Sequence, residues 1–204
     1  MYAPKHNQLE DRAALLAYMR AYSFATLASA GPAGLTATHL PFVIEDEDGR
    51  ITLLAHMAKA NPQWRDFAAG AEALVIFMQP HAYVSPRLYD SRQNVPTWNY
   101  VAVHAYGRPA LIEERAAKIE LQKKLIRQHD AGYLEQMAEL PGSYLDAKLA
   151  AIVSFSLAVT RIDARYKLSQ DKNPAERERI ARDLEASGDS VDAETARLMR
   201  QHNG

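Results

Sequence analysis

The chain has 204 residues, of which 48% are hydrophobic and 24% charged, the composition of an ordinary globular protein. It contains no cysteine, which excludes disulfides, thiolate metal sites and cysteine nucleophiles, and its formal net charge is −1, from 24 basic against 25 acidic residues. Because the N-terminus lacks an apolar leader and no apolar run reaches 18 residues, we expect a soluble, cytoplasmic protein without a membrane span.

The chain is predicted to begin with a helix at residues 8–22, where apolar side chains recur at near-helical spacing and Asn7 is a suitable N-cap. Two strands follow, at 23–30 and 34–44, on either side of a Gly-Pro turn. Pro41 lies inside the second strand, which indicates a sheet edge or a bulge at that point.

An acidic Asp-Gly turn leads to a third predicted strand at 51–57. Asn61 then caps a short helix that has Pro62 at its first position and runs to about residue 69. The apolar run at 73–78 predicts a strand with both faces covered, and the Pro-, Ser- and Asp-rich stretch at 79–97 predicts a long loop.

The remainder of the chain mixes strands and helices without regular alternation. We expect a strand at 98–112, helices at 113–129 and 144–151, a last strand at 153–162, and a polar helical stretch at 174–202 that is interrupted at 187–190. The absence of a repeated strand-helix-strand pattern disfavours a doubly wound parallel sheet. The sequence therefore predicts a mainly β fold of the α+β class, an antiparallel barrel with flanking helices.

One stretch, HMAKANPQW at 56–64, places two potential cations between a strand and a helix. The helix start at Asn61 leaves free backbone N–H groups and a partial positive charge, and Lys59 and His56 add to it. This combination suits a phosphate group. A capped helix preceded by an exposed lysine would give the same pattern, so the residues alone leave both readings open.

Two further stretches carry groups that suit a ligand. In the strand at 98–112, alternation places four aromatic rings on one side, which suits a flat heteroaromatic ligand but equally a core or a subunit interface: Trp98, Tyr100, His104 and Tyr106. Directly after the last strand, RYKLSQDK offers polar and basic groups for an anionic ligand, or forms a solvated connection: Arg165, Lys167, Ser169 and Gln170.

Other kinds of site lack their sequence signals. The chain has no Gly-rich nucleotide loop and no G-x-S-x-G motif, and its seven histidines are scattered without metal-ligand spacing, so we predict no metal.

Six stretches together resemble the PaiB family, which is described as FMN-binding negative transcriptional regulators with a split β-barrel fold. They are MYAPKH at 1–6, THLPF at 38–42, HMAKANPQW at 56–64, PHAYVSP at 80–86, VPTWNYVAVHAYG at 95–107 and YKLSQDK at 166–172. The resemblance runs in order from residue 1 to about residue 199. Gln79 departs from it, because a glycine is expected before Pro80, and this puts the local turn in doubt.

The resemblance implies a homodimer with FMN in a groove at the subunit interface. The phosphate would lie near the end of the third strand, the isoalloxazine against the second strand, and a later segment would close the groove. The implied FMN-binding residues are Thr38, His39, Leu40, His56, Met57, Lys59, Asn61, Trp98, Lys167, Ser169 and Gln170. We expect the barrel domain with its flanking helices at 1–165 and a helical extension at 166–204.

The resemblance implies a negative transcriptional regulator, whereas the residues themselves give DNA binding little support. The net charge is not basic, and the second helix of the only helix-turn-helix candidate opens with Asp192 and Glu194, where phosphate-facing groups would be wanted. The alternative is an FMN-dependent oxidoreductase acting on a small molecule, with His104 and Tyr100 as the nearest candidates for an acid or base. A flavin sensor that regulates through a protein partner is a third reading.

Overall fold

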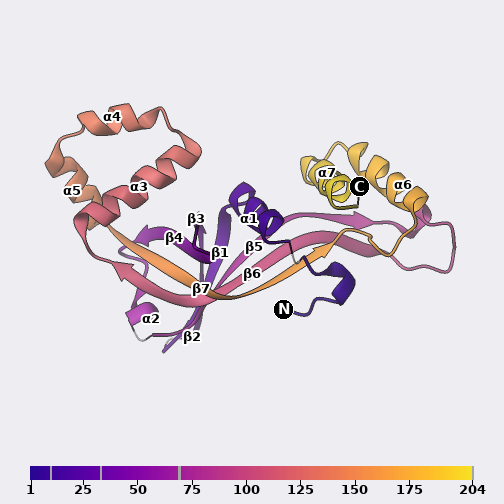
Figure 1. Ribbon diagram of the computed structural model, residues 1–204, viewed down its shortest axis with the longest axis horizontal. Coiled ribbons are helices and arrows are strands. Elements are labelled where there is room, and N and C mark those ends of the chain that lie inside the picture. The colour runs from indigo at the N-terminus through magenta and orange to yellow at the C-terminus, as the bar shows by residue number, and fades with distance from the viewer. Residues whose placement is uncertain (10, 33, 69, 204) are drawn as a thin grey trace. The chain divides into compact units, whose positions relative to one another are not determined.

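The computed structural model describes residues 1–9, 11–32, 34–68 and 70–203, and within them the chain forms one seven-stranded antiparallel sheet with flanking helices (Figure 1). The strand order is β2-β1-β5-β6-β7-β4-β3. The strands are β1 (Phe24–Gly31), β2 (Gly34–Pro41), β3 (Val43–Glu47), β4 (Arg50–Ala58), β5 (Ala73–Val84), β6 (Thr97–Ile112) and β7 (Ile152–Lys167). The predicted α+β class with an antiparallel sheet is confirmed.

The helices occur at the ends of the chain and between strands. They are α1 (Arg12–Ala21), α2 (Trp64–Ala68), α3 (Arg115–His129), α4 (Tyr133–Glu139), α5 (Gly142–Ala150), α6 (Pro174–Glu185) and α7 (Ser190–Asn203), with short 3-10 turns at Lys5–Asn7 and Pro86–Leu88. Among the described residues, none of these helices is both long and apolar enough to cross a bilayer.

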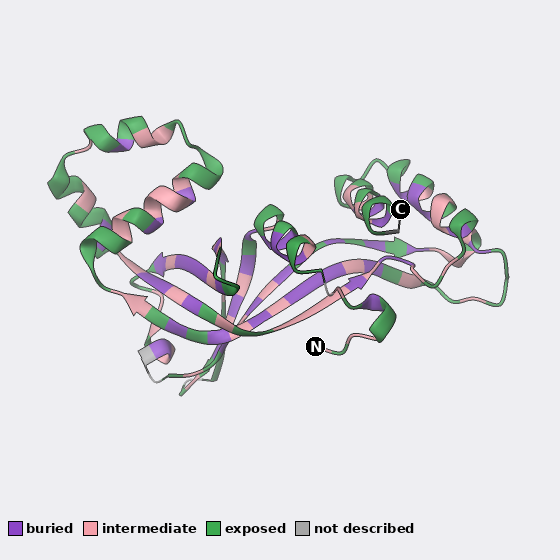
Figure 2. Ribbon diagram, viewed as in Figure 1, coloured by how far each residue is buried: buried purple, intermediate pink, exposed green. Residues whose placement is uncertain are grey.

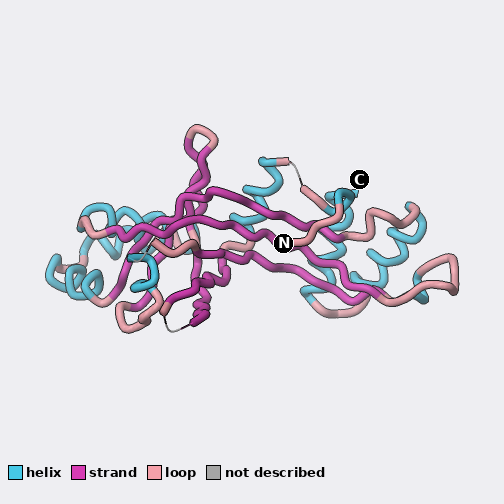
Figure 3. The backbone as a smooth tube through the Cα atoms, turned by 90° about the horizontal axis from the view of Figure 1, so that it is seen from below, coloured by secondary structure: helices cyan, strands magenta, loops and turns pink. Residues whose placement is uncertain are grey.

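The chain divides into two compact units. Unit 1 comprises residues 1–17, 78–104 and 163–204, and unit 2 comprises residues 18–77 and 105–162. The strands β5, β6 and β7 are the longest, at 12, 16 and 16 residues, and contribute to both units (Figure 3). The predicted domain boundary at residue 165 stays a prediction.

Unit 2 has an aromatic core. Phe42, Phe77 and Phe155 are fully buried, and the Phe42 ring meets the other two edge-on at centroid distances of 6.1 and 6.3 Å. Each such pair adds about 0.5–1.5 kcal/mol to the free energy of unfolding beyond the area it buries. Buried residues alternate with less buried ones along β1 and in much of β4 (Figure 2), so one face of each of these two strands packs inward.

Two predicted boundaries between β2 and β6 are wrong. The strand predicted at 34–44 is broken at Phe42, whose N–H donates to Ser23 O at 2.9 Å, although β2 is an edge strand as Pro41 indicated. The loop predicted at 79–97 is shorter, since β5 continues to Val84 with alternating buried and exposed residues. The alternation was not recognised in the sequence because QPHAYV, at 79–84, contains a proline and polar residues.

The caps also differ from expectation. Asn7 lies in a 3-10 turn, and α1 is capped instead by Asp11, whose Oδ1 accepts the N–H groups of Ala13 and Ala14 at 2.9 and 3.3 Å. The helix predicted from Pro62 begins two residues later, at Trp64, and its expected end at residue 69 lies outside the described residues. The prediction missed α4 and ended the last strand five residues early, but the interruption between α6 and α7 is confirmed.

Candidate functional site

The turn between β4 and α2 is tied to β2 by side-chain hydrogen bonds. Asn61 Nδ2 donates to Thr38 Oγ1 at 2.8 Å, and Asn61 Oδ1 accepts the N–H of Gln63 at 3.0 Å. The Thr38 hydroxyl in turn donates to Gln63 Oε1 at 2.5 Å. Two residues that sequence analysis assigned to one site, Thr38 and Asn61, are therefore in direct contact.

The buried side chain of Gln63 links the turn to β1 and β2. Gln63 was not identified as a site residue from the sequence. Its side chain is only 2% exposed, and Nε2 donates to Leu27 O at 3.1 Å, Ser29 Oγ at 3.1 Å and Thr36 O at 3.2 Å. A buried amide must be satisfied in this way, because an unpaired polar group costs free energy. The available signal was a polar residue inside the quoted motif, directly before the aromatic Trp64.

Two cations flank the turn. Lys59 and Arg65 are exposed, and no carboxylate of the described residues lies within ion-pair distance of either. The Lys59 carbonyl accepts Trp64 Nε1–H at 3.1 Å, and the Arg65 guanidinium lies 5.2 Å from the centroid of the Trp64 ring. A fixed turn with two uncompensated cations is chemically suited to a dianion such as a phosphate monoester.

The second strand presents its residues on two faces. Thr38 and Leu40 share one face, on which Leu40 is buried, whereas His39 lies on the other face with its Nδ1 2.9 Å from Thr26 Oγ1. One ligand cannot contact all three side chains from one side. However, β2 ends the strand order, so backbone N–H and C=O groups along its outer edge are available to a ligand or a second chain.

His56 and Met57 lie on opposite faces of β4. Met57 is buried in the core at 2% exposure. His56 Nδ1 is instead 3.2 Å from Gln122 Nε2 on α3, and burial lowers the pKa of His56. The ring is therefore neutral at pH 7, which removes it from the expected pair of cations at the turn unless a ligand restores its proton.

The later predicted residues form a second cluster, within unit 1. Lys167 Nζ donates to Trp98 O at 2.8 Å and to Thr97 Oγ1, and burial lowers the pKa of Lys167. Ser169 exchanges hydrogen bonds with the buried Asn99, and both line a pocket of about 190 Å³ together with Lys167.

Both polar atoms of the Gln170 side chain are used in hydrogen bonds to nearby backbone groups. Its Oε1 accepts the Leu168 N–H at 2.8 Å, and its Nε2 donates to Tyr166 O. The exposed Trp98 ring is packed edge-on against His81 and Tyr83, with centroid distances of 5.8 and 6.0 Å. The rings that pack against Trp98 thus come from β5, and the aromatic surface predicted from Trp98, Tyr100, His104 and Tyr106 stays a prediction.

Comparison with known proteins places these features in a family. A family model described as "Putative FMN-binding domain" matches residues 1–161. The chain is 35% identical over 202 residues to the protein named protease synthase and sporulation protein PAI 2 of Bacillus subtilis (strain 168), which covers 98% of this chain and 96% of the relative.

Two solved structures share the fold. The flavocytochrome Anf3 from Azotobacter vinelandii superposes with a TM-score of 0.64 at 16% identity, over 81% of this chain and 72% of the other. The FAD and heme binding protein from Mycobacterium smegmatis gives 0.61 at 23% identity, over 79% and 73%. The predicted split β-barrel is confirmed. The sequence relatives and the fold agree with the six motifs, and the chain belongs to the PaiB family of FMN-binding-domain proteins.

Proposed function

We propose that this protein binds FMN with the phosphate at the turn between β4 and α2. The observation that carries the proposal is the pair of cations, Lys59 and Arg65, on either side of a turn that the side-chain hydrogen bonds of Thr38, Asn61 and Gln63 hold in place. A phosphate monoester carries up to two negative charges and accepts several charge-assisted hydrogen bonds. Lys59, Arg65 and Asn61 would hold the phosphate, while Thr38 and Gln63 keep the turn in place.

The flavin ring is proposed to lie along β2, from Thr38 to Leu40, where the outer strand edge offers backbone hydrogen-bonding groups. When bound, the flavin supplies hydride- or electron-transfer chemistry, and the chain's own residues bind and orient it. The role of Met57 in this proposal is to fix β4 from the core side. Trp98, Lys167, Ser169 and Gln170 are proposed as a second group of flavin contacts.

We further propose a homodimer with the flavin at the subunit interface. Two large apolar side chains are exposed on the β1–β2 hairpin, Leu35 at 88% and Phe24 at 66%, and β2 is an unpaired edge. Exposed apolar surface beside a free strand edge is typical of an interface. Light scattering should give twice the chain mass; a monomer at high concentration would argue against a flavin at an interface.

The test of the cofactor compares FMN with riboflavin, which lacks the phosphate. Lys59→Ala should weaken FMN binding by about 1–3 kcal/mol, the range for a lost charge-assisted hydrogen bond, and should leave riboflavin binding unchanged. Lys118→Ala, which removes a lysine from α3, is the matched control. A purified protein that is colourless and takes up no added FMN would overturn the assignment.

For cellular role we propose negative regulation of transcription, on the strength of the family and of a relative named as a sporulation protein. Direct reading of duplex DNA by α6 and α7 is poorly supported by their charges. Arg200 is paired with Glu178 at 2.6 Å and Glu185 at 2.9 Å, and Arg197 is paired with Glu194. Such pairing leaves few free cations for phosphate contacts.

Fluorescence anisotropy with promoter fragments, at several salt concentrations, tests the regulatory role. A regulator that binds DNA should prefer particular fragments and lose affinity as salt rises. NAD(P)H oxidation coupled to an acceptor, without any DNA preference, would instead favour the alternative, an FMN-dependent oxidoreductase.

A further inference from the structure

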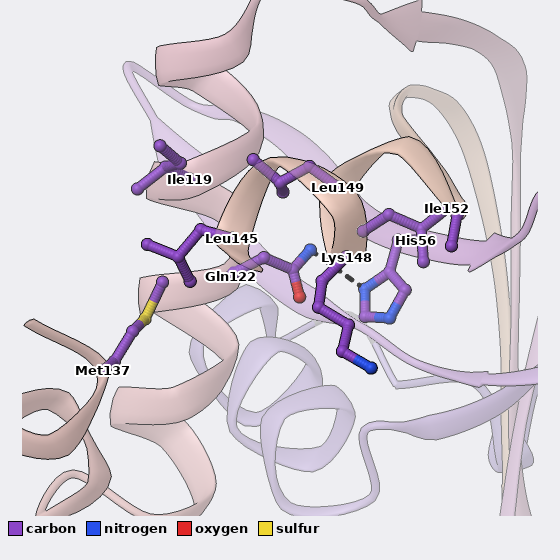
Figure 4. Close-up of a pocket in the computed structure, with 9 residues that line it drawn as sticks. His56, Ile119, Gln122, Met137, Leu145, Lys148, Leu149 and Ile152 are labelled. Carbon is purple, nitrogen blue, oxygen red and sulfur yellow. Dashed lines mark hydrogen bonds between the residues drawn. The ribbon is translucent and has the colours of Figure 1, made fainter. Parts of the chain in front are cut away.

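A pocket of about 260 Å³ lies in unit 2 where α3, α4 and α5 meet the end of β4 and the start of β7 (Figure 4). The pocket is partly open to solvent, so a small molecule could enter it from the surface. It is slightly below the range of about 300–1,000 Å³ that is common for small-molecule sites. The proposed flavin contacts leave this space unused, except that His56 lines it.

Most of the pocket wall is hydrocarbon. The apolar lining comes from Ile119 on α3, Met137 on α4, Leu145 and Leu149 on α5, and Ile152 on β7. In Figure 4, Ile119, Met137 and Leu145 lie at one side of the pocket, away from His56. This end can take only an apolar group, because it offers no hydrogen-bonding side chain.

The other end gathers hydrogen-bond donors. With Gln122 Nε2 donating to His56 Nδ1, the neutral ring carries its proton on Nε2 and presents it as a donor. Lys148 lies at the same end (Figure 4), 5.1 Å from the centroid of the Tyr144 ring. No carboxylate of the described residues pairs with the Lys148 ammonium group.

A buried hydroxyl on the same face of the sheet also lacks a partner. Ser154 is fully buried, and its Oγ has no hydrogen bond. Ser154 pairs with His56 in the register of β4 and β7, and alternation puts it on the face of Ile152, which lines the pocket. The Lys148 ammonium group and the His56 ring N–H thus lie at one end of the pocket. The unsatisfied Ser154 hydroxyl lies on the same sheet face as His56, behind the pocket lining.

We propose that this pocket binds a small organic monocarboxylate with a compact aromatic or branched aliphatic body. The carboxylate meets the Lys148 ammonium and His56 Nε2–H, and the hydrocarbon body packs against Leu145 and the other apolar residues. A free phosphate fits less well, because most of the wall would desolvate it without offering donors. The assignment uses neither Lys59 nor Arg65, the cations proposed for the flavin phosphate, so either proposal can fail while the other stands.

Isothermal titration calorimetry tests the site with benzoate and 4-methylpentanoate. At least one of the two should bind, and benzamide, which has the shape of benzoate without its charge, should bind about tenfold more weakly. Lys148→Gln should weaken binding of the acid about tenfold and leave benzamide binding unchanged. Lys123→Gln on α3, which removes an equal charge outside the pocket lining, is the control and should change neither.

A second variant tests the apolar end. Leu145→Trp should fill the cavity and abolish binding of acid and amide alike, while thermal unfolding of the variant shows that the fold persists. Failure of both acids to bind the wild-type protein at millimolar concentration would overturn the proposal. So would an unchanged acid affinity in Lys148→Gln.

Discussion

Gln63 is the residue on which the local structure of the candidate site depends most. Its buried amide donates hydrogen bonds to backbone carbonyl groups on β1 and β2 and accepts one from the Thr38 hydroxyl. Gln63→Met keeps the size of the side chain but leaves these groups unpaired inside the protein. We expect the free energy of unfolding to fall by about 2–4 kcal/mol, measured by urea denaturation.

The control for this change is Gln93→Met in the exposed loop before β6, which should alter stability by less than about 0.5 kcal/mol. Gln63→Met should also weaken FMN binding, because the turn that carries Lys59 and Asn61 loses its anchor. Equal stability of Gln63→Met and wild type would show that the network contributes little.

His56 makes stability depend on pH in a defined direction. Its folded-state pKa is lowered by burial, so below about pH 6.5 the unfolded chain takes up a proton that the folded chain does not. The free energy of unfolding therefore falls as pH drops from about 6.5 through the lower folded pKa. In His56→Gln, this decline should be shallower than in wild type.

An NMR titration of the imidazole protons, with His56→Gln used to assign the signal, measures the folded-state pKa of His56 directly. A midpoint at or above 6.5 would contradict the prediction. Part of the remaining slope in the variant comes from His202, whose pKa burial also lowers.

At the scale of elements, β6 leaves no room for a side chain at Gly107, where it lies against β7. A Cβ built at this position would lie 2.2 Å from Ala158 O and 2.6 Å from Leu157 Cδ2. Gly107→Ala should therefore force the strands apart and lower the free energy of unfolding by about 2–3 kcal/mol. The measurement is thermal or urea unfolding.

Gly142 provides the matched control, since a Cβ there would meet nothing within 4 Å and the residue begins α5. Gly142→Ala should leave stability unchanged or raise it by up to about 1 kcal/mol. If both variants lost stability equally, close strand contact at Gly107 would not be the cause.

Helix α6 has a complete capping box. The Asn173 side chain accepts the Glu176 N–H at 2.9 Å, and Glu176 Oε2 accepts the Asn173 N–H at 3.3 Å. Asn173→Ala should cost about 1–2 kcal/mol of unfolding free energy, because the Glu176 N–H at the helix start loses its acceptor and Asp90 loses the hydrogen bond from Asn173 Nδ2. Asn94→Ala, in a surface loop, should change the urea midpoint little; a similar loss in both would refute the capping role.

Secondary structure was predictable where its periodicity was continuous. The strand β6 and the interruption between α6 and α7 follow from alternation and from Ser-Gly-Asp-Ser. The second half of β5 was not predicted from the sequence, because polar residues and a proline interrupt the apolar run after Met78. The structure nevertheless continues the alternation there, with Pro80 buried and His81 exposed. The cap of α1 was misplaced because the helix begins at Arg12, four residues later than predicted, and Asp11 accepts the first free N–H groups.

At the scale of the whole molecule, the fold class followed from the order of the elements, while the site depended on contacts distant in sequence. Thr38 and Asn61 are 23 residues apart and Gln63 and Leu27 are 36 apart, and no local pattern predicts such pairs. Through the family, the six motifs placed Thr38 and Asn61 in one site, but they gave no sign of the Gln63 contacts. They also could not show that the His56 ring is paired with Gln122 on α3.

The Lys59 N–H donates to the carbonyl of Ala151 at 2.9 Å, and Ala151 is part of the wall of the carboxylate pocket. One backbone hydrogen bond therefore joins that pocket to the turn that carries Lys59. If an acid in the pocket displaced Ala151 enough to change the affinity for FMN, thermodynamic reciprocity would require FMN to change the affinity for the acid by the same factor. The two ligands would then regulate each other's binding through a single peptide group.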